Sequence, residues 1–193
     1  MKKNHSLIIS MGIIVLIFVL VGISFSQGTG FTTPRKGDTI ESRQDFVVSL
    51  EIDKFDNTTG HYWVAIASVT GAANWEKVIE LYKKSAGKSG EAAKAGQEEM
   101  KKLIGEWKID QVWPKFYVPV SPYQGRVFDG GQNPMKGFEP QPMILLILKV
   151  DDTLQNYFRT WFQAGEAGKG YPGIPVSRFS QNMILARCEI FFP

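Results

Sequence analysis

Two residues of this chain carry side chains that often act in catalysis, a histidine and a cysteine. Apart from His5 near the start, the chain has one histidine, His61, and one cysteine, Cys188. A Ser-His-Asp triad could use His61, but it opens an expected strand beside bulky aromatics and no spacing marks a triad, so a structural role is favoured. Cys188 lies between Arg187 and Glu189 in an apolar run, as is typical of a small buried side chain rather than a nucleophile. The sequence therefore identifies no catalytic residue.

Metal and phosphate sites are also not indicated. One histidine and one cysteine do not supply the ligands of a zinc site. The densest acidic pair, Asp151-Asp152, lacks the spacing of a calcium loop and is better explained as a helix cap. Residues 86–89 resemble the end of a phosphate-binding loop, but Tyr82 stands where that motif needs glycine. We expect no metal and no cofactor.

An aromatic cluster in a Pro/Gly-rich region is the remaining candidate site. Rings beside hydrogen-bonding groups can stack on sugars or anchor a peptide or protein partner. The alternative is that the rings fasten a long loop to the core. The candidate ligand- or partner-binding residues are Trp113, Phe116, Tyr117, Tyr123, Arg126, Phe128 and Asp129.

The N-terminal segment indicates on which side of the membrane these residues lie. Leu7 to Phe25 contain no charge and no proline, and as a helix they would rise about 28 Å, close to the hydrocarbon thickness of a bilayer. Lys2 and Lys3 precede the segment, which favours a cytoplasmic N-terminus and a C-terminal domain outside the cytoplasm. Residues 1–26 are thus a membrane anchor of a single-pass protein or, if cleavage occurs near Ser26, a signal peptide that releases a secreted form.

The rest of the chain predicts one extracytoplasmic globular domain over residues 44–193, joined to the anchor by a flexible tether over 27–43. Residues 46–52 and 61–69 have strand character, and a hairpin between them is the economical interpretation. Residues 73–106 predict an inserted helical hairpin, with Asn74 as the cap of its first helix. Its many Lys and Glu residues are typical of a solvated face.

Strand character returns after the helical hairpin. Pro114 and Pro119 flank residues 115–118, which predicts an edge strand or an extended surface segment. A Gly/Pro-rich stretch over 121–142 follows. The C-terminal part then predicts a strand–helix–strand unit. Residues 143–150 are almost all apolar, as in a central strand buried on both faces. Asp151 or Asp152 caps a helix with an aromatic stripe that ends at Gly165, and residues 183–191 form the last strand.

Together these elements predict an α+β fold. We expect a mostly antiparallel β-sheet or sandwich, with the inserted helical hairpin and the C-terminal strand–helix–strand unit, preceded by one N-terminal hydrophobic helix. The net charge is +3, and Lys2 and Lys3 supply two of these charges. The nearly neutral remainder argues against a nucleic-acid partner.

Three functions are compatible with this sequence. The anchor, the scarcity of catalytic side chains and the aromatic cluster favour a membrane-tethered binding or assembly module, such as an accessory subunit of an envelope complex with a protein or glycan partner. An alternative is an envelope glycan-acting hydrolase or transferase that uses carboxylates such as Asp110, Asp129 and Glu139. A third is a structural spacer domain without a ligand.

Overall fold

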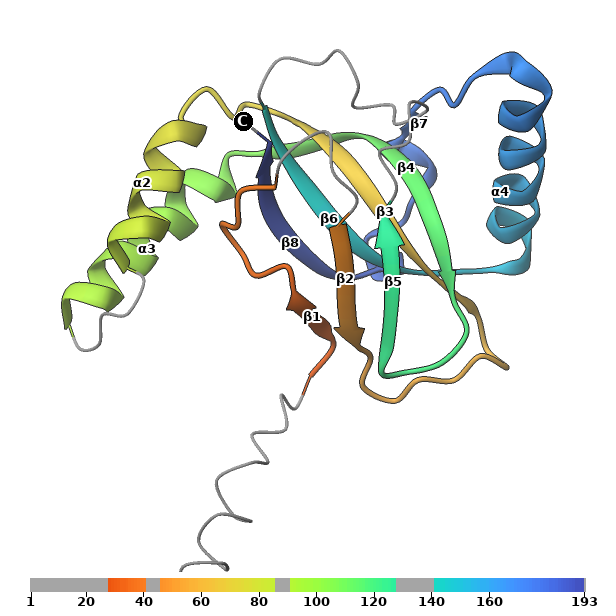
Figure 1. The fold of residues 1–193 in the computed structure, drawn as a ribbon, viewed down its shortest axis with the longest axis horizontal. Coiled ribbons are helices and arrows are strands. Elements are labelled where there is room, and N and C mark those ends of the chain that lie inside the picture. The colour runs from red at the N-terminus through yellow and green to blue at the C-terminus, as the bar shows by residue number, and fades with distance from the viewer. Residues whose placement is uncertain (1–27, 41–45, 86–90, 128–140, 193) are drawn as a thin grey trace, which may run out of the picture.

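A computed structural model describes residues 28–40, 46–85, 91–127 and 141–192. Within these ranges the fold is α+β, with two antiparallel sheets and three α-helices, which confirms the predicted class (Figure 1). None of the helices in these ranges is long and apolar enough to cross a bilayer. The hydrophobic segment over 7–25 lies outside the described residues.

The larger sheet has five strands, and its centre is buried on both faces. Its order is β7-β4-β3-β6-β8. From Tyr62 to Ala67 in β3 and from Met143 to Leu148 in β6, every side chain is buried, so both strands need neighbours on each edge and cover on each face. The strands are β3 (His61–Thr70), β4 (Lys108–Val118), β6 (Gln141–Val150), β7 (Ile174–Pro175) and β8 (Ile184–Phe192).

The smaller sheet has the order β1-β2-β5 and packs on one face of the larger sheet (Figure 1). It consists of β1 (Gly30–Thr33), β2 (Phe46–Glu51) and β5 (Tyr123–Val127). In β2, Val48 and Leu50 are buried while their neighbours are partly exposed, the alternation of a strand with one face on the core. Both sheets share one hydrophobic core cluster, so the sandwich form of the prediction is the one observed.

The predicted hairpin between residues 46–52 and 61–69 is wrong. The strand β2 pairs with β1 and β5, whereas β3 pairs with β4 and β6 in the other sheet. The burial patterns explain the difference. The strand β2 buries one face and suits the outer layer, but β3 is buried on both faces and takes a central place in the larger sheet.

The prediction of a flexible tether over 27–43 is also wrong for residues 28–40. Gly30–Thr33 form β1, which pairs antiparallel with β2. Beyond it, the backbone of Ile40 donates to the Phe191 carbonyl and Phe191 donates to the Asp38 carbonyl. This segment therefore covers the outer edge of β8, which would otherwise expose unpaired backbone groups.

The helix α4 (Asp152–Ala164) packs against the face of the larger sheet that is opposite the smaller sheet. Trp63 contacts Phe158 and Phe162 of this helix at ring-centroid distances of 5.3 and 5.7 Å, and its indole N–H donates to Gln155. The Asp151 carboxylate accepts from the Leu154 backbone at 2.8 Å, which confirms the predicted cap. At the C-terminal end the chain continues from Gly165 in a π turn, and the left-handed residue is Gly168, not Gly165.

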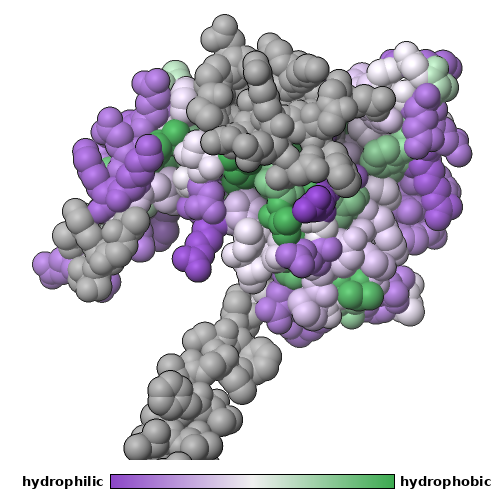
Figure 2. All heavy atoms as spheres, viewed as in Figure 1, coloured by the Kyte–Doolittle hydropathy of each residue, from purple (hydrophilic) through white to green (hydrophobic). Residues whose placement is uncertain are grey.

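The predicted helical insertion is confirmed as α2 (Trp75–Ser85) and α3 (Glu91–Gly105), which lie to one side of the sheets beyond β8 (Figure 1). The outward surface of this hairpin is strongly hydrophilic (Figure 2). Its base is held by Phe191 of β8, which is fully buried among the rings of Trp75, Tyr82 and Trp107. The Asn74 side chain accepts from the Trp107 indole at 2.9 Å, so it joins the two ends of the insertion.

Two further differences concern the segment after the hairpin. Residues 108–118 form one strand that continues through Pro114, where the pairing with β3 shifts register, as expected for proline at a bulge. Within the Gly/Pro-rich stretch, Tyr123–Val127 form β5, and its partner β2 lies far away in the sequence. Residues 128–140 lie outside the described ranges. Short 3₁₀ turns at Val176–Arg178 and Gln181–Met183 lead into β8.

Candidate ligand-binding pocket

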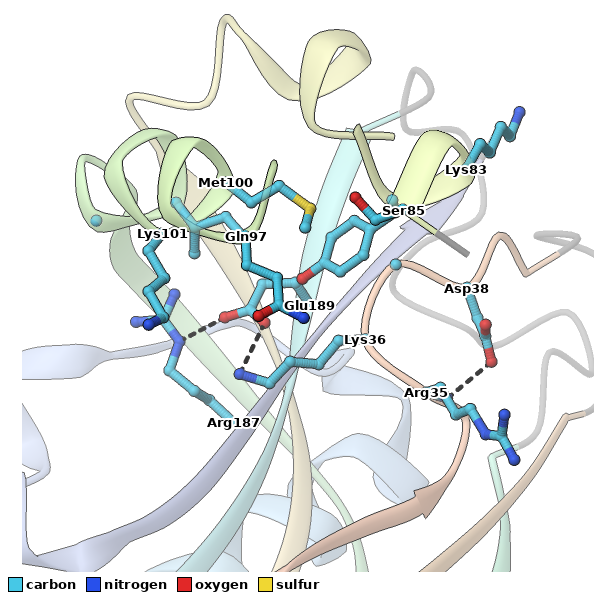
Figure 3. A pocket seen from close by; sticks show the side chains of 14 residues that line it. Arg35, Lys36, Asp38, Lys83, Ser85, Gln97, Met100, Lys101, Arg187 and Glu189 are labelled. Carbon is cyan, nitrogen blue, oxygen red and sulfur yellow. Dashed lines mark hydrogen bonds and ion pairs between the residues drawn. The ribbon is translucent and has the colours of Figure 1, made fainter. Parts of the chain in front are cut away.

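A pocket of about 860 Å³ opens between the helical hairpin, the 35–38 segment and β8 (Figure 3). This volume is within the range of small-molecule sites, which are commonly 300–1,000 Å³. Three separate parts of the chain line the pocket: the segment after β1, the helical hairpin through the C-terminal end of α2 and the C-terminal half of α3, and the middle of β8. The lining residues are Arg35, Lys36, Gly37, Asp38, Tyr82, Lys83, Ser85, Gln97, Met100, Lys101, Ile104, Gly105, Arg187 and Glu189.

The wall formed by residues 35–38 is fixed by backbone bonds to β8. Gly37 donates to the Glu189 carbonyl at 2.8 Å, and the Arg35 backbone donates to the Asp38 carboxylate at 2.7 Å. Gly37 has φ +86°, and a Cβ atom there would lie 2.3 Å from the Tyr82 ring. Only glycine satisfies both the left-handed backbone and the close approach to that ring. The wall is therefore joined to both β8 and α2.

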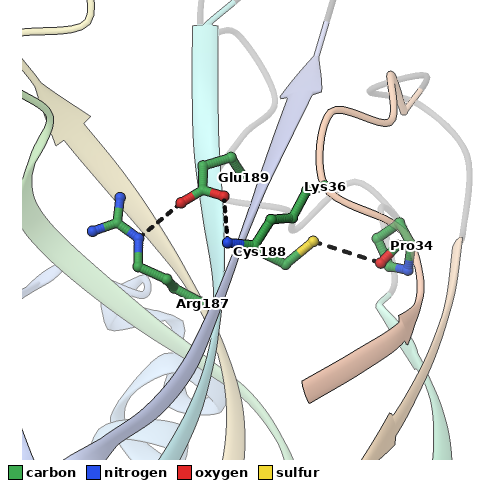
Figure 4. Close-up of polar contacts among 5 residues, drawn as sticks. All are labelled: Pro34, Lys36, Arg187, Cys188 and Glu189. Atoms are coloured by element: carbon green, nitrogen blue, oxygen red, sulfur yellow. Dashed lines mark hydrogen bonds and ion pairs between the residues drawn. The ribbon is translucent and has the colours of Figure 1, made fainter. Parts of the chain in front are cut away.

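The floor of the pocket is a buried ion-pair group on β8 (Figure 4). The Glu189 side chain is 1% exposed; its Oε1 accepts from Arg187 Nε at 2.8 Å, and its Oε2 lies 3.4 Å from Lys36 Nζ. Arg187 and Glu189 are two residues apart in a strand, so they share one face. Among the described residues, Arg187 Nη2 and Glu189 Oε2 are buried without a hydrogen-bond partner. Such atoms are costly unless a further group satisfies them.

Apolar side chains of α2 and α3 form the wall on the side of the helical hairpin. Met100 of α3 is 6% exposed, and Tyr82 and Ile104 are partly buried. Burial, and then the negative charge of Glu189, raise the pKa of the Tyr82 hydroxyl well above its ordinary value, so this side chain stays neutral. The site therefore combines a charged floor with a largely apolar wall.

Cys188 lies on the same strand but is not part of the pocket. Its Sγ is buried and lies 3.5 Å from the Pro34 carbonyl. Burial, and then the nearby Glu189 carboxylate, raise the pKa of the Cys188 thiol to about 12. The thiol stays protonated at neutral pH, which agrees with the structural role predicted for it.

The structure does not bring the predicted aromatic candidates into one surface. Trp113 is buried and donates its indole N–H to the Tyr171 carbonyl. Phe116 and Tyr123 contact each other between the two sheets. Tyr117 lies on the other face of β4, against Trp63 and His61. Arg126 is exposed on β5, and Phe128 and Asp129 lie outside the described residues.

The other chemical candidates are dispersed as well. Asp110 is exposed on β4, while Asp129 and Glu139 lie outside the described ranges. His61 Nε2 lies 2.8 Å from Asp152 Oδ1, at the exposed start of α4. In the described part of the chain, no group of three His, Cys, Asp or Glu residues could hold a metal ion.

Sequence reasoning missed the pocket because its three walls are far apart in the chain. One local signal was present: Arg187 and Glu189 place two opposite charges on one face of an otherwise apolar strand. No protein-family model, curated protein or solved structure matches this chain.

Proposed function

We propose that this protein is a membrane-tethered binding module that receives its ligand in the pocket between the α2–α3 hairpin and β8. The observation that carries the proposal is the pocket floor, where Glu189 is buried and where Arg187 Nη2 and Glu189 Oε2 have no hydrogen-bond partner beside a cavity of about 860 Å³. A domain that served only as a spacer would gain nothing from burying charged atoms in this way, because they cost stability.

Placement outside the cytoplasm is part of the same proposal. It is supported by the uncharged apolar run Leu7–Phe25 and by Lys2 and Lys3 before it. A module anchored in this way would hold its ligand at the membrane surface, alone or as the accessory subunit of an envelope complex. The glycan-acting alternative receives no comparable support from Asp110, which is exposed on β4 and does not line the pocket.

The test is recovery of the full-length protein from gently solubilised membranes, followed by mass spectrometry of what accompanies it. The blocking variant is Gly105→Trp, because Gly105 lines the pocket and a Cβ atom there meets nothing within 4 Å. The matched control is Lys102→Trp, which adds the same ring at an exposed position of α3 that does not line the pocket.

We expect wild type and Lys102→Trp to retain the same small molecule and Gly105→Trp to lose it. Equal retention by all three proteins, or recovery of the wild type with nothing bound, would refute the pocket as the binding site. Placement is tested separately by protease digestion of sealed membrane vesicles of known orientation. If the protease is added to the external face of the membrane and the domain is protected from digestion, the proposed topology is contradicted.

A further inference from the structure

We infer that the ligand of this pocket is an amphiphilic carboxylate, a small molecule with one anionic head on an apolar body. The inference rests on the proposed function, since it names the chemical class that the same pocket would take. Three features of the pocket support it: the charge of the floor, an unused hydrogen-bond donor, and the apolar wall.

The floor has a net charge of +1, because it holds two positive side chains and one negative side chain. Lys36 and Arg187 share the single carboxylate of Glu189. Figure 3 shows the side chains of Arg35 and Lys83 directed away from this group. Among the other charged lining residues, Asp38 accepts from the Arg35 backbone and Lys101 pairs with Glu98, so the balance at the floor is set by Lys36, Arg187 and Glu189. A ligand with one negative charge would neutralise the group, whereas a cationic ligand would meet two like charges.

Arg187 supplies the donor for such a head group. Its Nε is used by Glu189, and its Nη2 has no hydrogen-bond partner but is shielded from solvent, so the side chain, which is 36% exposed, would turn to present this donor to the ligand. A carboxylate oxygen is the preferred partner of a guanidinium N–H, and a charge-assisted bond of this kind is stronger than one to a neutral group. Lys36 is 57% exposed and flexible, so its Nζ can turn from the 3.4 Å contact with Glu189 toward the second oxygen of the ligand.

The wall of the pocket explains why the anion would carry an apolar body. Met100, Ile104 and the ring of Tyr82 line the pocket on the side of the hairpin. Inorganic anions would leave the exposed parts of Tyr82 and Ile104 in contact with water. An alkyl or aryl body would cover them, and each buried methylene would tighten binding by a factor of about four.

The experiment measures binding of hexanoate, hexanamide and acetate to the full-length protein in a nonionic detergent by saturation-transfer NMR. Hexanamide has the same shape as hexanoate without the charge, and acetate has the charge without the chain. We expect hexanoate to bind about tenfold more tightly than hexanamide, because the charged head gains a charge-assisted bond. Acetate should bind more weakly than hexanoate by at least tenfold.

Variants separate the head-group contact from general electrostatics. Lys36→Gln should weaken hexanoate binding about three- to tenfold and leave hexanamide unchanged. Lys84→Gln removes the same charge from an exposed position on α2 outside the pocket and should change neither. Equal affinities for hexanoate and hexanamide, or equal effects of the two lysine variants, would overturn the inference.

The outcome also separates this inference from the proposed function. If wild type retains a native molecule that Gly105→Trp loses, but hexanoate does not bind, the pocket stands as a binding site and the carboxylate class is refuted. If hexanoate binds wild type and Gly105→Trp equally, the assignment to this pocket is refuted. Lys36→Gln keeps the inference falsifiable even if Gly105→Trp does not fold, because Lys36 is exposed and its loss spares the core.

Discussion

The two cations at the pocket floor should contribute very unequally to the stability of the domain. Arg187 Nε donates to Glu189 at 2.8 Å, and its loss would leave a carboxylate that is 1% exposed with only a 3.4 Å contact to Lys36. Lys36 is 57% exposed, so after its loss the tighter Arg187 contact remains. We therefore compare Arg187→Gln with Lys36→Gln.

The magnitudes follow from burial. A hydrogen bond to a charged group contributes about 1.5–3 kcal/mol, and stranding a buried charge reaches about 3–5 kcal/mol. Because Arg187 is itself 36% exposed, we expect Arg187→Gln to lower the free energy of unfolding by about 1.5–3 kcal/mol. The Lys36 contact resembles a surface ion pair, so Lys36→Gln should change that free energy by less than about 1 kcal/mol.

The assay is urea unfolding of the full-length protein in detergent, followed by tryptophan fluorescence. The single variant Glu189→Gln and the double variant Arg187→Gln/Glu189→Gln complete a mutant cycle, and its coupling energy should exceed about 1 kcal/mol because the two side chains are in direct contact. A Lys36→Gln variant as unstable as Arg187→Gln, or a coupling energy near zero, would refute the idea that a buried ion pair forms the floor.

Three further results are expected. Phe191→Ala should lower the free energy of unfolding by about 3–5 kcal/mol and speed hydrogen exchange in residues 75–105, because Phe191 is fully buried at the base of the hairpin; slow exchange there would argue against this anchor. Cys188 should resist Ellman's reagent at pH 8 until urea unfolds the domain, since burial raises its pKa to about 12, and rapid labelling of native protein would contradict that burial. The two hydrogen bonds from Thr58 to the Asp56 carboxylate hold the pKa of Asp56 below its ordinary value. NMR titration should show that the Asp56 carboxyl is protonated at a lower pH than a free aspartate. Any stabilisation of the fold by this carboxylate is therefore present above the ordinary pKa of aspartate and is lost as the pH falls. A titration like that of a free aspartate would refute this prediction.

The parts of the fold that local pattern determines were predictable. The run of apolar residues over 143–150 specified a strand buried on both faces, and Asp151 specified the start of α4. The helical hairpin followed from its spacing of apolar residues. In each case the signal lies within about twenty consecutive residues, the range over which periodicity and capping act.

Pairing between distant segments was not predictable from local pattern. The strand β1 follows a Gly-containing stretch that resembles a linker, and β5 lies in a Gly/Pro-rich one, so neither shows strong strand character. The pocket depends on the same kind of distant contact. Lys36 and Glu189 are separated by most of the domain, and nothing in the residues around either one specifies that they meet.

The central claim, that the pocket beside α3 holds the ligand, is tested most directly by photo-crosslinking in native membranes. A benzophenone-bearing residue is placed at position 105 in one protein and at position 117 in another, and each is irradiated before purification. We predict an adduct of small-molecule mass at position 105, where the pocket is open, and none at Tyr117, which packs against Trp63. An adduct at position 117 alone would contradict the account and would indicate that the ligand binds at the aromatic residues of β4 instead.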